Sequence, residues 1–241
     1  MSKAEIHATL QGRAATYGLL ARLLATELSE GLLNDLKRTE FPRDTGIESI
    51  DSGSRYITDY LAKVGDDVDG TKTELAVDFA RLFVVRSKST VGAAYPFESV
   101  YTSKEHRMMG DARSEVKAIY QTVGLGRDKN WNVGEDHVAL ELEFMQILAQ
   151  RCNDALASED TAQATSLLEQ QLSFLERHLE NWVPLFARDM ERHAKTDFYR
   201  GVALFLAGWI GCEAETVEML EAQLKRAQDA GATGQASDGT N

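Results

Sequence analysis

The chain has 241 residues, enough for one large or two small domains with a buried core, and 43% of its residues are hydrophobic, as in ordinary globular proteins. Acidic residues outnumber basic ones by 38 to 26, which gives a formal net charge of −12. Such a surface repels nucleic acid and anionic membranes and attracts cations. The charge therefore disfavours a nucleic-acid-binding protein and makes a basic peptide a natural ligand.

Apolar residues recur at helical spacing through the first half of the chain. The whole sequence contains only three prolines, so long helices are rarely interrupted. Thr71 and Glu74 form a capping-box pattern that indicates where one helix begins, and Asp111 can cap another. The spacing and these signals predict helices over residues 5–28, 31–38, 51–64, 71–84 and 111–123.

The stretch GLGRDKNWNVGE at residues 124–135 contains three glycines and two asparagines and is the clearest joint in the chain. After it, the spacing predicts helices over residues 136–156, 160–180, 182–193, 197–210 and 214–227. No segment alternates with a two-residue period. The sequence therefore predicts an all-α fold of roughly ten helices. They are expected to pack as two helical subdomains, 1–123 and 136–228, followed by a disordered tail at 229–241.

The cysteines and the apolar runs bear on the cellular compartment. Cys152 and Cys212 lie in separate apolar helical patterns, so they predict neither a metal pair nor a disulfide framework. The N-terminus lacks the continuous apolar core of a signal peptide, and the apolar run at 201–211 is too short to span a bilayer. We therefore expect a cytoplasmic protein with two buried, reduced thiols and no stable membrane insertion.

Signatures of the common enzyme classes do not occur in the sequence. The chain has no GxxxxGK[ST] phosphate loop, no strand–GxGxxG–helix unit and no GxSxG elbow. Helical di-metal enzymes use Glu-x-x-His motifs, and no glutamate stands three residues before His106, His137, His178 or His193. We therefore expect no catalytic residue of these classes.

The sequence GEDHVALELEFM at residues 134–145 places acids and a histidine where the joint becomes a helix. Glu141 lies one turn beyond His137 on the same helix face. Asp136 can cap the helix, and Glu135 and Asp136 can complement its dipole. Alternatively, Asp136, His137 and Glu141 can contribute to a metal site or bind a cationic ligand. The residue pattern leaves these three interpretations open.

The sequence YPFESVYTSKEHRMMGD at residues 95–111 concentrates aromatic and methionine side chains between two predicted helices. Tyr101, Met108 and Met109 alternate with charged residues, and flat or pliable apolar side chains of this kind are typical of adaptable peptide-binding surfaces. Other aromatic residues in the segment, such as Phe97, can equally anchor it onto the core. The segment is thus a candidate wall of a binding groove.

Several stretches, in this order, are similar to motifs of the TorD/DmsD family of chaperones, to which the NarJ-type chaperones are related. They are ARLFVV, YPFESVY, MMGDARSEVKAIYQTVGL and GEDHVALELEFMQIL. The stretches FLERHLENWVPLFARDM and FYRGVALFLAGWI resemble the C-terminal helices of that family, so the resemblance covers about residues 77–210. Two departures occur. Gly134 and Glu135 replace the usual Glu-Pro before Asp-His, and Phe97 stands where Tyr is common.

The resemblance implies a cytoplasmic chaperone that assists the folding, cofactor insertion and pre-export proofreading of a molybdenum-containing reductase. Such chaperones bind the twin-arginine signal peptide of the reductase, and some contact its apo form. Carboxylates suit the two arginines, and apolar surface suits the stretch that follows them. On this interpretation the signal-peptide-binding residues are Tyr101, Met108, Met109, Glu135, Asp136, His137 and Glu141.

The resemblance also leaves two other functions open. The first is a GTP-binding or GTP-hydrolysing accessory protein, although no phosphate loop supports nucleotide binding, and we expect no cofactor. The second is a structural subunit that stays bound to its reductase. A flexible joint between two helical halves is compatible with both a monomer and a domain-swapped homodimer.

Overall fold

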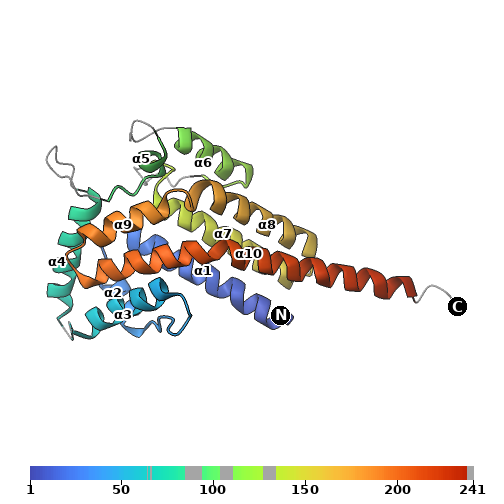
Figure 1. Ribbon diagram of the computed structural model, residues 1–241, viewed down its shortest axis with the longest axis horizontal. Helices are drawn as coiled ribbons and strands as arrows, with labels where there is room; N and C mark the ends of the chain where they lie inside the picture. The colour runs from blue at the N-terminus through green and yellow to red at the C-terminus, as the bar shows by residue number, and fades with distance from the viewer. Residues whose placement is uncertain (64, 66, 85–93, 104–110, 127–133, 238–241) are drawn as a thin grey trace.

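Helices make up the regular elements of the chain over all the residues that the structure describes. The computed structural model describes residues 1–63, 65, 67–84, 94–103, 111–126 and 134–237, without the side chains of 227–237. Over these residues the all-α fold is confirmed. The elements, drawn in Figure 1, are α1 (Lys3–Ala25), α2 (Glu30–Arg38), α3 (Glu48–Lys63), α4 (Val68–Phe79), the π-helical η1 (Ala80–Val84), α5 (Glu98–Thr102), α6 (Asp111–Thr122), α7 (Val138–Ala157), α8 (Thr161–Phe174), the π-helical η2 (Leu175–Leu179), α9 (Val183–His193) and α10 (Asp197–Ser237).

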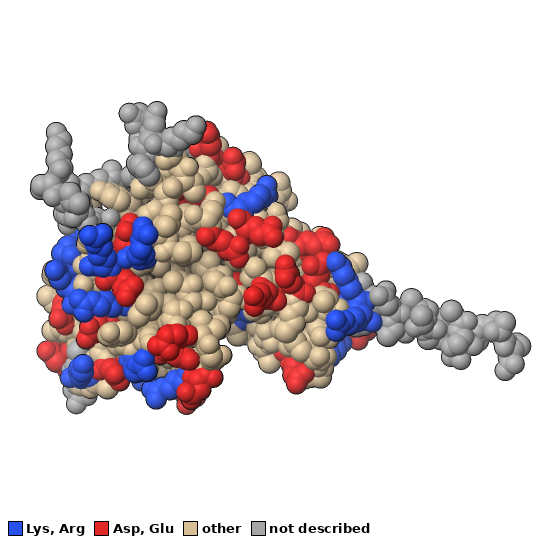
Figure 2. Space-filling view, viewed as in Figure 1, with Lys and Arg blue, Asp and Glu red and all other residues tan. Residues whose placement is uncertain are grey.

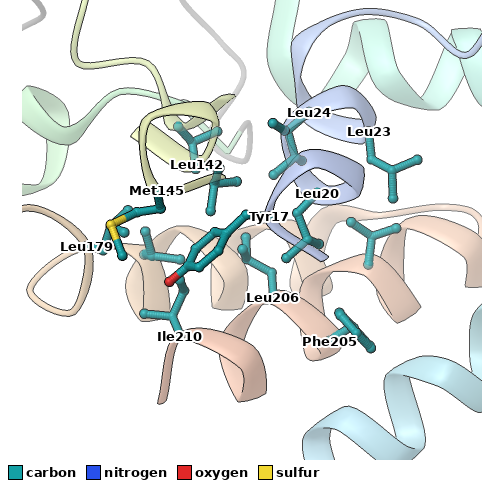
Figure 3. Close-up of a cluster of buried hydrophobic side chains, with 14 of the residues drawn as sticks. Tyr17, Leu20, Leu23, Leu24, Leu142, Met145, Leu179, Phe205, Leu206 and Ile210 are labelled. Atoms are coloured by element: carbon teal, nitrogen blue, oxygen red, sulfur yellow. The ribbon is translucent and has the colours of Figure 1, made fainter. Parts of the chain in front are cut away.

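The long helix α10 lies at the centre of the packing (Figure 1). Helices α3, α8 and α9 pack against α10, and α7 packs against both α8 and α1. Side chains of α1 thereby meet those of α7, η2 and α10 in a buried cluster (Figure 3). This cluster includes Tyr17, Leu20, Leu24, Leu142, Met145, Leu179, Leu206 and Ile210. No helix in the described part of the chain is both long and apolar enough to cross a membrane.

The hydrophobic core does not follow the division into subdomains that the sequence suggests. Helices α1 and α3 belong to residues 1–123, yet they pack mainly on α7 and α10, which belong to residues 136–228. An amphipathic helix buries its apolar face against a complementary surface, however distant that surface is along the chain. The described residues of the two segments therefore share one core. Residues 127–133, most of the predicted joint, lie outside the described part of the chain.

Helix α10 replaces two helices that the sequence predicts, at 197–210 and 214–227. The prediction places a break near Gly211, where a glycine costs a helix about 1 kcal/mol relative to alanine. The structure continues through this point because Val217 and Leu220 extend the buried face of the helix. Burial of these side chains, about 1.5–3 kcal/mol each, outweighs the cost of one glycine.

The start of α4 and the end of α10 also differ from the sequence prediction. Helix α4 begins one turn before the expected start, because the carboxylate of Asp67 accepts the Gly70 N–H at 2.9 Å and caps the helix there. Helix α10 continues to Ser237, so residues 229–237 are helical where the sequence predicts disorder. Extending an existing helix costs far less than starting one, which favours this continuation. Residues 238–241 lie outside the described part.

A buried ion pair joins the beginning of the chain to its last helix. Arg13 of α1 donates to both carboxylate oxygens of Glu213 of α10, with Nε–Oε distances of 3.0 Å and an Nη2–Oε2 distance of 2.6 Å. Its Nη1 donates to Gln171 of α8 at 2.7 Å. The two charged side chains are only 2% and 1% exposed. The pair therefore fixes α1 against α8 and α10 with every charge compensated.

The two cysteines behave almost as the sequence predicts. Cys152 is buried, as expected, whereas Cys212 is half-buried, and both are free thiols. Burial raises the pKa of Cys152 to about 11, so its thiol stays protonated and unreactive at neutral pH.

Candidate functional site

Residues 94–103, which we call the α5 segment, are attached to the turn before α7. The Glu98 N–H donates to the Asp136 carbonyl at 3.0 Å, and the Val138 N–H donates to the Pro96 carbonyl at 3.0 Å. The ring of Phe97 stands edge-on to the ring of His137, with centroids 5.1 Å apart. Phe97 is 6% exposed and so anchors the segment, one of the two roles that the sequence allows for it.

Asp136 does not cap α7, so that interpretation of the sequence is wrong. His137 is the N-cap, and its Nδ1 accepts the Ala139 N–H at 3.2 Å. The Asp136 carboxylate instead accepts the Ser99 N–H at 3.2 Å and thereby caps α5 from outside. Gly134 leaves room for this arrangement, since a Cβ there would lie 2.6 Å from Asp136 Oδ1.

Burial of the His137 ring favours the neutral imidazole, which is the form whose Nδ1 can accept the Ala139 N–H. The side chain is 6% exposed. Burial lowers the pKa of His137 to about 4, so the imidazole is neutral at physiological pH and Nδ1 can accept the Ala139 N–H. The histidine thus begins α7 and does not supply positive charge.

Glu135 connects the same turn to α6. Its Oε2 accepts from Arg113 Nε at 2.6 Å, and its carbonyl accepts from the Tyr120 hydroxyl at 3.4 Å. Glu135 is 5% exposed. This carboxylate is therefore neutralised by an arginine of the chain itself.

Glu141 lies in the interior and contacts groups that the sequence analysis does not identify. Its Oε2 accepts from Trp182 Nε1 at 3.1 Å, and it faces Glu98, whose Oε2 lies 3.1 Å from His178 Nδ1. Burial raises the pKa of Glu141 well above its ordinary value, and the carboxylates of Glu98 and Asp136 raise it further. A glutamate within the otherwise apolar stretch YPFESVY, and a histidine on a predicted apolar helix, were the signals available in the sequence.

Tyr101 is the described member of the predicted apolar wall, and it is half-buried. Its ring lies against Trp182 and Phe186, with centroids 5.6 Å and 6.3 Å away, and its hydroxyl donates to Asp189 Oδ2 at 3.2 Å. Burial raises its pKa, so the hydroxyl stays protonated. Met108 and Met109 lie outside the described residues.

The structure thus gathers the predicted polar residues but places them inside. Glu135, Asp136, His137 and Glu141 are 0–6% exposed, and each serves an internal contact. An arginine of a ligand reaches them only if the α5 segment moves. In the described part of the chain, no group of three or more His, Cys, Asp or Glu side chains is arranged to hold a metal ion.

A groove elsewhere in the molecule offers open apolar surface. It lies between α1, α7 and the end of α6 and has a volume of about 830 Å³. Its α1 wall carries small side chains together with Leu19 and the exposed Arg22, and its α7 wall carries larger apolar and polar ones; we call it the α1–α7 groove. The residues used below are Ala15, Gly18, Ala25, Leu140, Glu143 and Ile147.

Residues 47–188, more than half of the chain, match the family described as nitrate reductase delta subunit. The chain belongs to this family. Its relatives include two proteins named chaperone protein TorD. The one from Vibrio cholerae serotype O1 is 29% identical over 205 residues, which cover 82% of this chain and 88% of that protein. The one from Vibrio parahaemolyticus is 27% identical over 220 residues, which cover 90% of this chain and 98% of that protein.

Membership of the nitrate reductase delta subunit family confirms the resemblance to TorD/DmsD and NarJ-type chaperones that the motifs indicate. The relatives are named as chaperones and not as enzymes. The region that matches the family contains the α5 segment, α6, α7 and η2, and hence the whole buried polar cluster. Helix α1, which forms one wall of the α1–α7 groove, precedes that region.

Proposed function

We propose that this protein is a cytoplasmic chaperone that binds the twin-arginine signal peptide of a molybdenum-containing reductase and assists maturation of the enzyme before export. The observation that carries the proposal is an open apolar groove in a chain of this family, whose relatives are named chaperones. On this proposal the protein needs no cofactor of its own. Its partner is the signal peptide together with the apo form of the reductase.

The α1–α7 groove has the shape and chemistry that the apolar part of such a peptide requires. From Ala15 to Ala25 the α1 wall spans ten residues, or about 15 Å, enough for about ten residues of a bound helix. The exposed Ala15 leaves room for a bound helix on α1, while Leu140 and Ile147 supply apolar contact from α7. Removing apolar surface from water contributes about 25 cal/mol per Å² and gives the binding its driving force.

Charge supports the basic end of the same ligand. Glu143 and Arg22 are the charged residues in the wall of the groove, and both are exposed, so the favourable charge comes mainly from the surrounding surface. Acidic side chains also gather over α8, η2 and α10 on the face drawn in Figure 2. Burial raises the pKa of Glu180 there, and the neighbouring carboxylates of Glu176 and Glu218 add to the shift, as expected of crowded negative charge. A doubly basic peptide is attracted to such a surface, more weakly as salt increases.

The residues that the sequence analysis proposes as peptide contacts then divide into two groups. Tyr101 is half-buried and can contact the apolar stretch directly. Asp136, His137 and Glu141 are buried, so we propose that they act indirectly by holding the α5 segment, which carries Tyr101.

Calorimetric titration of the purified chain with a synthetic twin-arginine leader tests the proposed function. The leader should carry an Arg-Arg pair followed by an apolar stretch. We expect binding, about tenfold weaker when Lys-Lys replaces Arg-Arg, because lysine cannot make the two-pronged contact with a carboxylate. No binding of the leader in any form would exclude the proposed function.

A pair of matched variants locates the peptide. Ala15 and Ala8 are both exposed alanines of α1, but only Ala15 lines the groove. Ala15→Trp should fill the groove and weaken binding at least about tenfold, whereas Ala8→Trp should bind as the unchanged protein does. Equal binding by the two variants would place the peptide elsewhere on the molecule.

A further inference from the structure

Three carboxylates and one imidazole meet in the interior beneath the α5 segment. Glu98 comes from α5, Asp136 from the turn before α7, Glu141 from α7 and His178 from η2. Each of the four residues is at most 2% exposed. Residues far apart in the sequence therefore form one polar cluster that is shut off from water.

The hydrogen bonds of this cluster do not satisfy three ionised carboxylates. Glu98 Oε2 pairs with His178 Nδ1, and Glu141 Oε2 accepts from Trp182 Nε1. Glu141 Oε1 and His178 Nε2 are buried and have no hydrogen-bond partner among the described residues. A bare carboxylate oxygen in a dry interior costs several kcal/mol, a cost that a bound proton removes.

The charges lead to the same conclusion. Glu98 and Asp136, which adjoin Glu141, are carboxylates, whereas His178, which contacts Glu98, can carry positive charge. His137, one turn earlier on α7, is neutral because burial lowers its pKa to about 4. Tyr120 of α6 also stays neutral, because burial and these carboxylates raise its pKa. In an interior of low dielectric constant, one imidazolium cannot offset three ionised carboxylates, so the three cannot all stay ionised.

The position of the proton follows from the contacts. Burial and the adjacent carboxylates raise the pKa of Glu141, so Glu141 keeps its proton at a pH where exposed glutamates have lost theirs. Because Oε2 accepts from Trp182, the proton belongs on Oε1. From there it is available to the carboxylate of Glu98, which Glu141 faces.

We propose that Glu141, Glu98 and His178 form a proton-dependent latch. One proton shared by Glu141 and Glu98 holds the α5 segment on α7 and η2, and loss of that proton to solvent releases the segment. These are positioning residues, since they determine where Tyr101 lies without contacting a ligand. The latch is a property of the chain itself and does not depend on the proposed function.

The sign of the pH dependence follows from linkage. The latched state binds one more proton than the released state, in which Glu141 has an ordinary pKa near 4.3. Latching is therefore complete at low pH and weakens as pH rises toward the raised pKa of Glu141. Across this window each pH unit lowers the ratio of latched to released molecules by up to about tenfold.

Amide hydrogen exchange of the full chain, followed by NMR from about pH 5 to about pH 8, tests the latch. After correction for the intrinsic base catalysis of exchange, protection of the Glu98 and Ser99 amides should fall with pH by up to about tenfold per unit. In Glu141→Gln the protection should be independent of pH, because the glutamine N–H donates to Glu98 at every pH. The exposed residue Glu115 gives the matched control, since Glu115→Gln should keep the pH dependence.

Two results would overturn the latch. One is amide protection that does not change with pH in the unchanged protein, and the other is an equal pH dependence in Glu141→Gln. If Glu141→Gln fails to fold, Glu98→Gln serves in its place. It replaces the other carboxylate that shares the proton, so amide protection should again be independent of pH. A ¹³C titration of the Glu141 carboxyl gives a direct reading, and a value near 4.3 would refute the proposal. No peptide is needed, so failure to bind a leader would count only against the proposed function.

Discussion

At the scale of single residues, burial decides whether a side chain is available to a ligand. Asp136 and Glu141 are of the right type to bind arginine, but the first holds the Ser99 amide and the second holds the Trp182 indole. His137 is a neutral side chain that caps α7. By contrast, Tyr101 keeps part of its ring at the surface. The chemistry of a residue type is thus necessary for a site but does not define one.

The stability of the protein should depend on pH through His137. Its pKa is about 4 in the folded chain and 6.5 ordinarily. The unfolded chain therefore takes up a proton that the folded chain refuses, so stability is complete above about pH 6.5 and is lost as pH falls toward 4. The difference in pKa corresponds to about 3 kcal/mol. Urea unfolding at several pH values should show this loss, and His137→Asn, which still caps α7 but does not titrate, should not.

The half-buried His193 provides a control for this measurement. His193→Asn should keep the acid-induced loss that His137→Asn removes. Because Glu141 contributes stability with the opposite pH dependence, only the difference between variants isolates His137. An identical acid-induced loss in the unchanged protein and in His137→Asn would contradict the buried, neutral state of this ring.

At the scale of elements, glycines set how closely two helices pack. Helix α3 crosses α10 where Gly53 faces Gly201, and a Cβ on Gly53 would lie 2.5 Å from the backbone nitrogen of Phe205. A Cβ on Gly201 would lie 2.7 Å from the Gly53 carbonyl oxygen. Since these neighbours are backbone atoms, no side-chain rotation can relieve the overlap. The two glycines therefore fix the crossing of α3 on α10.

Substitution of Gly53 should show the cost of this contact. Gly53→Ala should lower the free energy of unfolding by about 1–3 kcal/mol, because α3 and α10 must move apart. Gly12 of α1 is the matched control, since nothing lies within 4 Å of a Cβ there. Gly12→Ala should stabilise the protein by about 0.5–1 kcal/mol, as in an exposed helix. Chemical denaturation measures both, and equal effects would show that the helices accommodate the extra carbon.

At the scale of the whole molecule, the first and last helices depend on one another. Arg13 and Glu213 are 200 residues apart in sequence and form a fully buried ion pair. Gln171 joins them from α8. Desolvation of both charges offsets much of their attraction, so the pair contributes more to a unique arrangement of helices than to net stability.

A double-mutant cycle should separate these contributions. Arg13→Met alone and Glu213→Leu alone should each cost about 3–5 kcal/mol, because each leaves one charge buried and uncompensated. The double variant should be more stable than either single one, because no uncompensated charge remains. Lys3→Met, which breaks the exposed pair with Glu159, should be nearly silent in the same urea titration. Strictly additive losses would mean that the two side chains do not interact.

The sequence by itself determined the features that depend on residues close together in the chain. The 3.6-residue spacing of apolar residues determines an all-helical fold, and most helix positions follow from it. The order of the motifs determines the family, which the match over residues 47–188 confirms. The proximity of Glu135, Asp136, His137 and Glu141 was also predictable, since one turn and one helix carry all four.

Only the tertiary structure decided which of these groups meet water and which meet one another. Glu98 and His178 are 80 residues apart, and they pair because the tertiary packing brings the α5 segment against η2. The continuity of α10 and the core shared by both halves of the chain likewise depend on contacts between distant helices. Burial and charge compensation are properties of the packed helices, and local spacing carries no information about which helix faces will be apposed.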